Sequence, residues 1–369
     1  MLGLIVANSP LANQYFRILN LSFAIDALGI SLQLSTLKLI NYCLMTIFFF
    51  VVGLEIKREL TSGHLSQIRK AAAPFFAAIG GMAIPALIYL AIAGSQAPRG
   101  WAVPVATDIA LAVGILVLMG TRATDGLKSF LLALAVIDDI GAIIIIAFVF
   151  SAGAIFSWLL AALAAVLAVV VLQKIGVMKS YIYAIVGILL WYSLYKAGVH
   201  PTLAGVIMGL LTPAHVTTDS RLIDVEDGSL TLVEKLQGNF HGFSAFIVVP
   251  LFAFANSGVQ LSADAIRDAS TSPIAWGIIL GLALGKPLGI LLAAKGAAKL
   301  GVAELPEGAR TSSLVAVGST AGIGFTVAIF IAKLAFTDPA TQDLAITAVM
   351  AGSLLSGLIG VALFRLIRQ

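Results

Sequence analysis

Two adjacent aspartates, Asp138 and Asp139, lie at the centre of the apolar run 130–150 in this chain of 369 residues. The run is 21 residues long. A helix rises about 1.5 Å per residue, so this length just spans a hydrocarbon core of about 30 Å. A single charge at the centre of such a span costs at least about 2.5–3.5 kcal/mol on insertion scales. The pair therefore predicts a site for protons or cations. The alternative is that the aspartates cap a helix in a soluble protein, but no turn residues surround them.

Lys286 lies in another apolar run and offers the opposite charge. Neighbours on a helix point about 100° apart, so Asp138 and Asp139 cannot both face one partner. One carboxylate is expected to face Lys286 and the other a water-filled cavity. A purely stabilising ion pair is the alternative for Lys286. With Asp108 there are three deep aspartates, so one lysine leaves at least one carboxylate to exchange a proton or a cation.

Asp108 follows a predicted break in its own span. Pro104 removes a backbone donor from the helix, and Thr107 lies directly before the aspartate. In lipid, the freed backbone groups must be satisfied by protein, water or ions. Asp108 is therefore either a simple N-cap of the second half-helix or part of the site, and these interpretations are compatible.

A second interruption is predicted at 318–324, which holds Gly318, Ser319, Thr320, Gly322 and Gly324. The two interruptions occupy the middle helices of two triplets, 71–150 and 274–364. These triplets enter the membrane from opposite sides and are predicted to be inverted repeats. Paired breaks of this kind indicate a transporter site, and the two broken helices are expected to cross. Asp108 would offset two positive helix ends, and Lys286 two negative ones.

The composition is that of a polytopic membrane protein. Hydrophobic residues make up 60% of the chain and charged residues 11%, with a mean hydropathy of +1.05. Soluble domains carry about 25% charged residues. The net charge of +4 follows the positive-inside rule better than it indicates nucleic-acid binding. The one cysteine, Cys43, excludes an internal disulfide and a cysteine-rich metal site.

Eleven apolar runs, or twelve with an N-terminal fragment, alternate with short connections. With a cytoplasmic N-terminus, 15 of the 22 basic residues fall on the cytoplasmic side and 6 on the other, and Lys286 is inside a span. This bias predicts twelve helices with both termini in the cytoplasm. The acidic connection 213–235 divides them into two halves. The predicted runs are 36–56, 71–93, 101–119, 127–150, 156–173, 181–195, 199–212, 240–257, 274–294, 312–336 and 343–364.

Residues 1–35 differ from the rest of the chain. An apolar stretch ends at Ser9-Pro10 after eight residues, which is too short to span a membrane, so the first helix is expected to be truncated or to begin part-way. Residues 30–35 alternate between apolar and polar, which predicts a strand of a short hairpin outside the bilayer.

The sequence resembles the NhaA family of sodium–proton antiporters along essentially its whole length. The most specific motifs are GWAVPVATDIALAVG at 100–114, ALAVIDDIGAIIII at 133–146 and GKPLGI at 285–290. The others are ANS at 7–9, FFFVVGLEIKREL at 48–60, AAIGGMAIPALIYL at 77–90, AGVHPTLAGVIMG at 197–209, PLFAFANSGV at 250–259 and GIGFTVAIFIA at 322–332.

The resemblance implies a role for each deep polar residue. It makes Asp139 the primary cation ligand and Asp138 its companion, which either completes the site or pairs with Lys286. Thr107 and Asp108 belong to the broken fourth helix and lend polar groups near the site. Lys286 is the lysine that pairs with an aspartate and balances the half-helix ends.

The resemblance also places a pH-sensing region at the cytoplasmic end of the second helix, with Glu55, Lys57, Arg58 and Glu59. Ordinary cytoplasmic end charges are the alternative for this cluster. The chain departs from the family where Asn41-Tyr42 replaces a frequent Asp, and near His241, where the family's histidines and glutamate are only partly present. These departures concern the residues that the resemblance connects with the pH profile rather than with transport.

The expected protein is an all-α membrane protein with about twelve helices, inverted repeats, two crossing broken helices and a small extracytoplasmic β-hairpin. It forms one transporter domain over residues 1–369 in the bacterial inner membrane. The expected function is electrogenic, pH-regulated extrusion of Na⁺ or Li⁺ in exchange for protons, with alternating access at a midplane aspartate site. No cofactor, enzymatic activity or nucleic-acid partner is expected. A homodimer through residues 9–35 is implied by the resemblance.

Two other functions are compatible with deep aspartates. A sodium-coupled symporter would need a more polar substrate cavity and would take up sodium without proton counterflow. An intramembrane aspartyl protease would need two aspartates on different helices, and only Asp108 with Asp138 offers such a pair. A channel is disfavoured by the deep lysine and the unequal halves.

Overall fold

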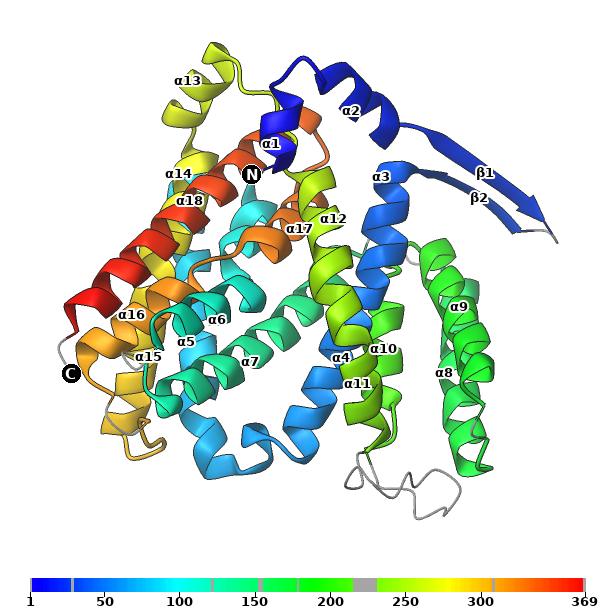
Figure 1. Ribbon diagram of the computed structural model, residues 1–369, viewed down its shortest axis with the longest axis horizontal. Helices are drawn as coiled ribbons and strands as arrows, with labels where there is room; N and C mark the ends of the chain where they lie inside the picture. The colour runs from blue at the N-terminus through cyan, green and yellow to red at the C-terminus, as the bar shows by residue number, and fades with distance from the viewer. Residues whose placement is uncertain are drawn as a thin grey trace. The chain divides into compact units, whose positions relative to one another are not determined.

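The computed structural model describes residues 2–27, 30–120, 123–151, 155–177, 179–214, 231–306 and 309–367. These residues are mostly helical, and the one sheet among them has two strands (Figure 1). The chain divides into two compact units. The first comprises Met1–Ala12, His64–Ile145 and Asn256–Gln369, and the second Asn13–Gly63 and Ile146–Ala255.

The first unit contains the elements that carry the deep aspartates and Lys286. Its helices are α1 (Leu2–Ala7), α5 (Ile68–Ala93), α6 (Ile109–Leu118), α7 (Asp125–Val149, which continues past the unit's boundary), α13 (Ala263–Thr271), α14 (Pro273–Leu280), α15 (Lys286–Lys299), α16 (Thr311–Ala321), α17 (Phe325–Ala335) and α18 (Pro339–Leu366). Two short 3₁₀ helices, η2 (His64–Ser66) and η3 (Pro98–Val105), and one π-helix, η6 (Gly281–Gly285), complete it.

The second unit contains the hairpin and the remaining helices. They are α2 (Ala12–Leu19), β1 (Ser22–Ala27), β2 (Ile30–Ser35), α3 (Thr36–Leu39), α4 (Met45–Thr61), α8 (Phe156–Lys174), α9 (Ser180–Ala197), α10 (Leu203–Leu211), α11 (Leu232–Phe243) and α12 (Val249–Asn256). Two π-helices, η1 (Ile40–Leu44) and η5 (Ser244–Val248), continue directly into α4 and α12.

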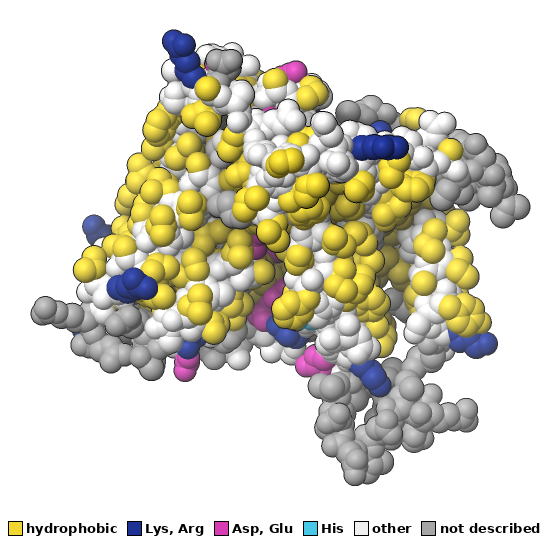
Figure 2. Space-filling model, turned by 45° about the horizontal axis from the view of Figure 1, so that its top comes forward, with side chains coloured by type: hydrophobic (Ala, Val, Ile, Leu, Met, Phe, Trp, Pro, Cys, Tyr) yellow, Lys and Arg dark blue, Asp and Glu magenta, His cyan; other side chains and the backbone are white. Residues whose placement is uncertain are grey.

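The outer helix surfaces are apolar, as a lipid environment requires. Large side chains such as Leu118, Phe148 and Phe246 are at least four-fifths exposed. Figure 2 shows hydrophobic side chains over most of the visible face, with few basic ones. Helices satisfy all their backbone groups internally, which is why the apolar runs adopt this form in a membrane.

Among the described residues, eight helical segments are long and apolar enough to cross a membrane, or nine if one bent pair counts as a span. That pair is α16 and α17, bent by 53°. The predicted runs 181–195 and 199–212 correspond to α9 and to the short α10. The predicted total of twelve helices, and the inverted repeats, stay predictions.

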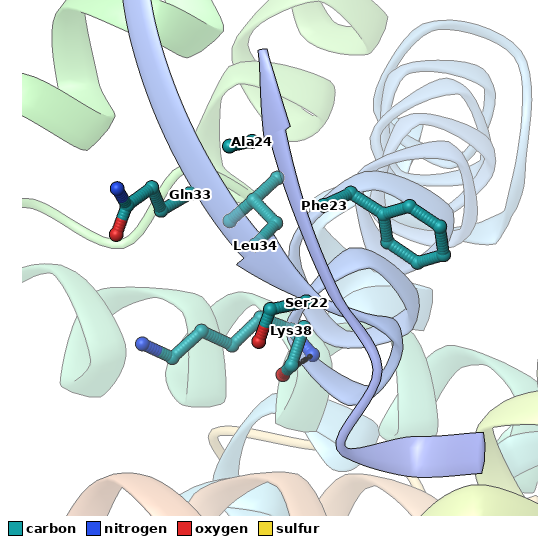
Figure 3. A pocket seen from close by; sticks show the side chains of 7 residues that line it. Ser22, Phe23, Ala24, Gln33, Leu34 and Lys38 are labelled. Atoms are coloured by element: carbon teal, nitrogen blue, oxygen red, sulfur yellow. Dashed lines mark hydrogen bonds between the residues drawn. The ribbon is translucent and has the colours of Figure 1, made fainter.

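The predicted strand at 30–35 is confirmed as β2. It pairs antiparallel with β1, in a register that runs from Ser22 opposite Ser35 to Ala27 opposite Ile30. The hairpin extends beyond the ends of α2 and α3 (Figure 1). A pocket lies against the base of the hairpin, lined by both strands and by Lys38 (Figure 3).

The N-terminal stretch is helical only over α1, which is six residues long. Asn8, just after it, ties this segment to the chain that follows α12. The Asn8 amide donates to Val259 O at 2.8 Å and its carbonyl accepts from Leu261 N at 2.7 Å. Parts of two sequence predictions lie outside the described residues: most of the acidic connection 213–235, and the basic residues Arg122, Arg221 and Arg368.

In the first unit, α5 and α15 approach so closely that their backbones touch. A Cβ on Gly289 would lie 2.1 Å from Gly80 O, and a Cβ on Gly80 would lie 2.3 Å from Gly289 O. Only glycine allows this distance, because a methyl group at either position would overlap the other backbone. The contact lies one helical turn from Lys286 and sets the position of that residue relative to α5.

Candidate functional site

Asp138 and Asp139 lie midway along α7 and are both buried. Asp138 is 1% exposed and Asp139 is 6% exposed. The helix continues through them without a break, so the adjacent carboxylates leave it in different directions. Neither is an end cap of a helix, because α7 begins at Asp125 and ends at Val149. The interpretation as capping residues in a soluble protein is therefore wrong.

Lys286 pairs with Asp138. Its Nζ donates a hydrogen bond to Asp138 Oδ2, and the lysine side chain is fully buried. The aliphatic part of the Lys286 side chain passes Gly81 of α5, which is next to the Gly80–Gly289 contact. A Cβ on Gly81 would lie 3.8 Å from Lys286 Cδ. An ion pair at this depth survives only when both charges are satisfied, since a lone buried charge is strongly unfavourable.

Thr107 lies on the other side of the same carboxylate oxygen. Its Oγ1 is 2.7 Å from Asp138 Oδ2 and 2.9 Å from Ala321 O, the last carbonyl of α16. A hydroxyl has one proton, so it donates to one of these acceptors at a time. Oδ1 of Asp138 is buried and has no hydrogen-bond partner among the described residues. The carboxylate therefore has one crowded oxygen and one with spare acceptor capacity.

Both predicted breaks are present, and their backbones are in contact. The first follows η3: Ala106 and Asp108 have extended backbone, and α6 begins at Ile109. The second separates Ala321 from Phe325. Asp108 N donates to Ile323 O at 2.6 Å, so the backbone of one break is hydrogen-bonded to the backbone of the other.

Asp108 faces the N-termini of two half-helices. Its Oδ1 accepts from Leu111 N at 3.2 Å, which caps α6, and its Oδ2 accepts from Thr326 N at 3.1 Å in the first turn of α17. Thr326 Oγ1 also donates to Oδ2 at 2.5 Å. A carboxylate at a helix N-terminus offsets the partial positive charge there. Asp108 is thus an N-cap that serves two helices at once.

Two hydroxyl residues of this region were not foreseen from the sequence. Thr326 binds Asp108, and Ser353 of α18 accepts a hydrogen bond from Phe325 N at 3.1 Å. The signal for Thr326 was its place directly after the Gly-rich break. No local pattern marks Ser353, because its partner is on another helix.

The structure brings the predicted residues together as two adjoining clusters. One joins Asp138, Lys286 and Thr107, and the other joins Asp108 to the start of α17. Within the part of the chain that is described, no three His, Cys, Asp or Glu side chains converge as a metal site would require. Lys286 contacts Asp138 in the first cluster, while Thr107 meets the C-terminal carbonyl of α16.

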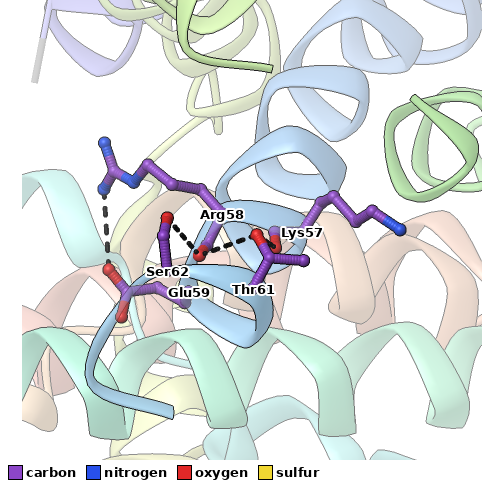
Figure 4. A network of polar contacts seen from close by, with 5 residues as sticks. All are labelled: Lys57, Arg58, Glu59, Thr61 and Ser62. Atoms are coloured by element: carbon purple, nitrogen blue, oxygen red, sulfur yellow. Dashed lines mark hydrogen bonds and ion pairs between the residues drawn. The ribbon is translucent and has the colours of Figure 1, made fainter. Parts of the chain in front are cut away.

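The predicted pH-sensing residues lie at the end of α4, in the second unit. Arg58 Nη2 is 3.6 Å from Glu59 Oε1, and the hydroxyls of Thr61 and Ser62 donate to Arg58 O (Figure 4). Glu55 is partly buried, and the charges of Arg58 and His241 act on it. Lys57 belongs to the same turn (Figure 4). These groups form a charged network at a helix end, as both interpretations of the cluster require.

Comparison with known proteins identifies the family. The family model described as Na⁺/H⁺ antiporter 1 matches residues 1–364. The chain belongs to this family. It is 45% identical over 369 residues to the Na⁺/H⁺ antiporter NhaA of Bordetella parapertussis, and this alignment covers 100% of this chain and 92% of that protein. It is 43% identical over 364 residues to the NhaA of Shewanella sp. (strain ANA-3), with 98% of this chain and 91% of that protein aligned. It is 42% identical over 370 residues to the NhaA of Citrobacter koseri, with 99% of this chain and 92% of that protein aligned.

Membership confirms the resemblance seen in the motifs. Proteins of the Na⁺/H⁺ antiporter 1 family are transporters rather than enzymes, so the aspartyl protease interpretation is set aside. Family membership and the long apolar helices together identify the chain as a multi-pass membrane protein.

Proposed function

We propose that this protein extrudes Na⁺ or Li⁺ from the cytoplasm in exchange for protons, across the bacterial inner membrane. The observation that carries the proposal is the buried Lys286–Asp138 pair beside a second buried carboxylate, Asp139. The family description and the names of the related antiporters give Na⁺ and H⁺ as the exchanged ions. Li⁺ is included because oxygen ligands suit it as well as Na⁺.

The mechanism is a competition for carboxylate oxygens. A carboxylate far from bulk water binds either a proton or a small hard cation, but hardly both. Oxygen ligands suit Na⁺ and Li⁺, and Asp138 Oδ1 has spare acceptor capacity on the side away from its crowded oxygen. If the binding bundle moves between two aqueous openings only when loaded, exchange is coupled. No chemical bond has to be made or broken.

We assign the residues as follows. Asp139 is the primary cation ligand, and Asp138 is its companion, which Lys286 releases when the cation binds. Thr107 contributes a hydroxyl at the same carboxylate. Asp108 offsets the partial positive charge at the N-termini of α6 and α17. Its carboxylate also supplies negative charge close to the bound cation. Lys286 compensates the charge of the site when no cation is present.

The exchange is proposed to be electrogenic, with more than one proton moving for each cation. The membrane potential then acts on the net charge moved, at about 2.3 kcal/mol per charge per 100 mV. The charged network of Glu55, Lys57, Arg58 and Glu59 is proposed to regulate the exchange by pH. Its support is the position of Glu55, which is partly buried among charged neighbours at a helix end.

For the topology we propose twelve passes, both termini in the cytoplasm, and one transporter domain over residues 1–369. The nine counted spans, together with α1, α9 and α10, give this number. The segments 71–150 and 274–364 are proposed as inverted repeats, supported by one broken helix in each. The hairpin of β1 and β2 is proposed to join two copies of the chain outside the bilayer.

The decisive experiment measures proton flux in proteoliposomes driven by Na⁺, Li⁺ or K⁺ over a pH series. Asp139→Asn should abolish the Na⁺- and Li⁺-driven flux. Asp125→Asn is the matched control, because Asp125 is on the same helix but its side chain is 96% exposed. Full activity of Asp139→Asn would refute the assignment. Sodium uptake without proton counterflow would instead indicate a symporter.

A further inference from the structure

The π-helix η6 leaves one backbone carbonyl without its usual donor. Lys286 N donates to Gly281 O, which is the long turn that defines this π-helix. In an α-helix the same N–H would serve Leu282 O, and in a continued π-helix the donor would be residue 287. Residue 287 is proline, which has no N–H. Neither donor that normally closes a turn on Leu282 O is therefore available.

A second orphaned group lies next to this carbonyl. Ser356 of α18 is fully buried, and its Oγ has no hydrogen-bond partner among the described residues. Both oxygens face Gly322 in the break between α16 and α17. The position that a Cβ on Gly322 would take is 2.4 Å from Leu282 O and 2.7 Å from Ser356 Oγ. A hydroxyl that can donate and a carbonyl that needs a donor thus lie near each other on the same side of Gly322.

The surroundings hold this arrangement in place. The side chain of Leu282 lies between two other glycines: a Cβ on Gly324 would be 3.1 Å from Leu282 Cδ2, and a Cβ on Gly352 would be 3.1 Å from Leu282 Cδ1. The π-helix, the break and α18 are therefore in contact around Leu282. Buried polar groups are nearly always paired, either with protein or with an ordered water.

We propose that Ser356 Oγ and Leu282 O bind one buried water molecule, which bridges α18 to the π-helix beside the break. The water accepts from, or donates to, the Ser356 hydroxyl and donates to Leu282 O. Buried waters typically make about three hydrogen bonds, and Ser319 O, 3.2 Å from the same Cβ position, is a further acceptor. The site itself does not depend on the proposed exchange.

The consequence for transport rests on the proposed function. A π-helix contains one more residue than an α-helix over the same turn, so it rotates the residues after it by about 100°. Lys286 is the first residue after η6, and its direction toward Asp138 depends on that extra residue. By satisfying Leu282 O, the water stabilises the π form and so keeps Lys286 directed at Asp138.

The test is a double-mutant cycle between Ser356→Ala and Pro287→Ala, read by thermal unfolding of the full chain in detergent. The alanine of the Pro287→Ala variant supplies an N–H for Leu282 O and keeps the Cα and Cβ that contact Gly318. We expect Ser356→Ala to lower the Tm by roughly 2–3 °C in the parent chain. In the Pro287→Ala background it should lower the Tm by much less, because the carbonyl no longer needs the water. Equal losses in both backgrounds, or no loss in the parent, would overturn the proposal.

Ser319→Ala is the matched control. Ser319 is also fully buried close to the break, but its Oγ donates to Val315 O within its own helix. Its Tm should stay close to that of the parent. All variants are measured in choline buffer, so that no transported cation contributes to the Tm differences.

Two further measurements keep the site and the proposed exchange apart. A structure of the parent protein at a resolution that shows waters should contain density within hydrogen-bond distance of both oxygens. A direct Ser356–Leu282 hydrogen bond without such density would refute the water. If the water directs Lys286, Ser356→Ala should change the KM for Na⁺ at least threefold while Ser319→Ala does not. A parent without antiport would refute the proposed function and leave the Tm cycle valid.

Discussion

Gly289→Ala tests how strongly the helix crossing determines the site. The new Cβ would lie 2.1 Å from Gly80 O and 2.6 Å from Gly80 C, whereas ordinary contacts are 3.4–4 Å. Both clashing atoms are backbone, so no rotamer change relieves them, and α5 and α15 must separate by about 1 Å. Such overpacking costs about 1–3 kcal/mol, partly offset by about 1 kcal/mol from the better helix propensity of alanine.

The separation should reach the ion pair, because Lys286 lies one turn away on α15 and its stem passes α5 at Gly81. We expect a lower Tm and a loss of antiport of at least about tenfold, since a displacement of about 1 Å strongly disturbs a precise site. The control is Gly296→Ala on the same helix, where a Cβ would meet nothing within 4 Å. If Gly289→Ala matched this control in both Tm and antiport, the reasoning would be refuted.

Three other changes probe the remaining contacts. Lys286→Ala should destabilise the protein by about 3–5 kcal/mol, because it strands the buried Asp138, whereas Lys286→Arg keeps the charge and should lose less. Thr326→Val should cost about 1.5–3 kcal/mol through its lost hydrogen bond to Asp108, measured by chemical unfolding. At the N-terminus of α18, hydrogen bonds from the first turn lower the pKa of Asp338. The ionised Asp338 therefore stabilises the fold at neutral pH, and this stabilisation is lost as the pH falls below about 4. In the Asp338→Asn variant the Tm should therefore depend less on pH in that range.

Each of these changes has an outcome that contradicts it. Equal melting of Lys286→Ala and Lys286→Arg would argue against the ion pair. Unchanged stability of Thr326→Val, with Thr341→Val as the exposed control that loses its bond to Asp338, would remove Thr326 from the anchoring of Asp108. A Tm difference for Asp338→Asn that stays constant from pH 7 to pH 3 would exclude titration of that carboxylate.

Much of the architecture could be predicted because its causes are local. The alternation at 30–35 has the period of a strand, and β2 covers those residues. Pro104 and the glycines at 318–324 weaken helices by their own chemistry, and the breaks lie at or just after them. The apolar runs become helices because lipid offers the backbone no other partner.

The features that the sequence could not resolve depend on rotation and on crossing. The 100° rule separates Asp138 from Asp139 but does not say which of them faces Lys286. That choice depends on η6, and one extra residue in a helical turn changes neither hydropathy nor composition. The role of Ser353 was hidden for a related reason, because its partner Phe325 is 28 residues away across the meeting of two helices.

The contact between the two breaks has a mechanical consequence. Asp108 N is bonded to Ile323 O, Thr107 contacts Ala321 O, and the Asp108 carboxylate binds Thr326. Pulling α6 away from α17 would strand all of these groups together in a medium that offers no replacement donors or acceptors. The four half-helices therefore act as a single stiff joint. The flexibility that a transport cycle demands has to come from the far ends of those half-helices and from the segments that connect them to the rest of the chain.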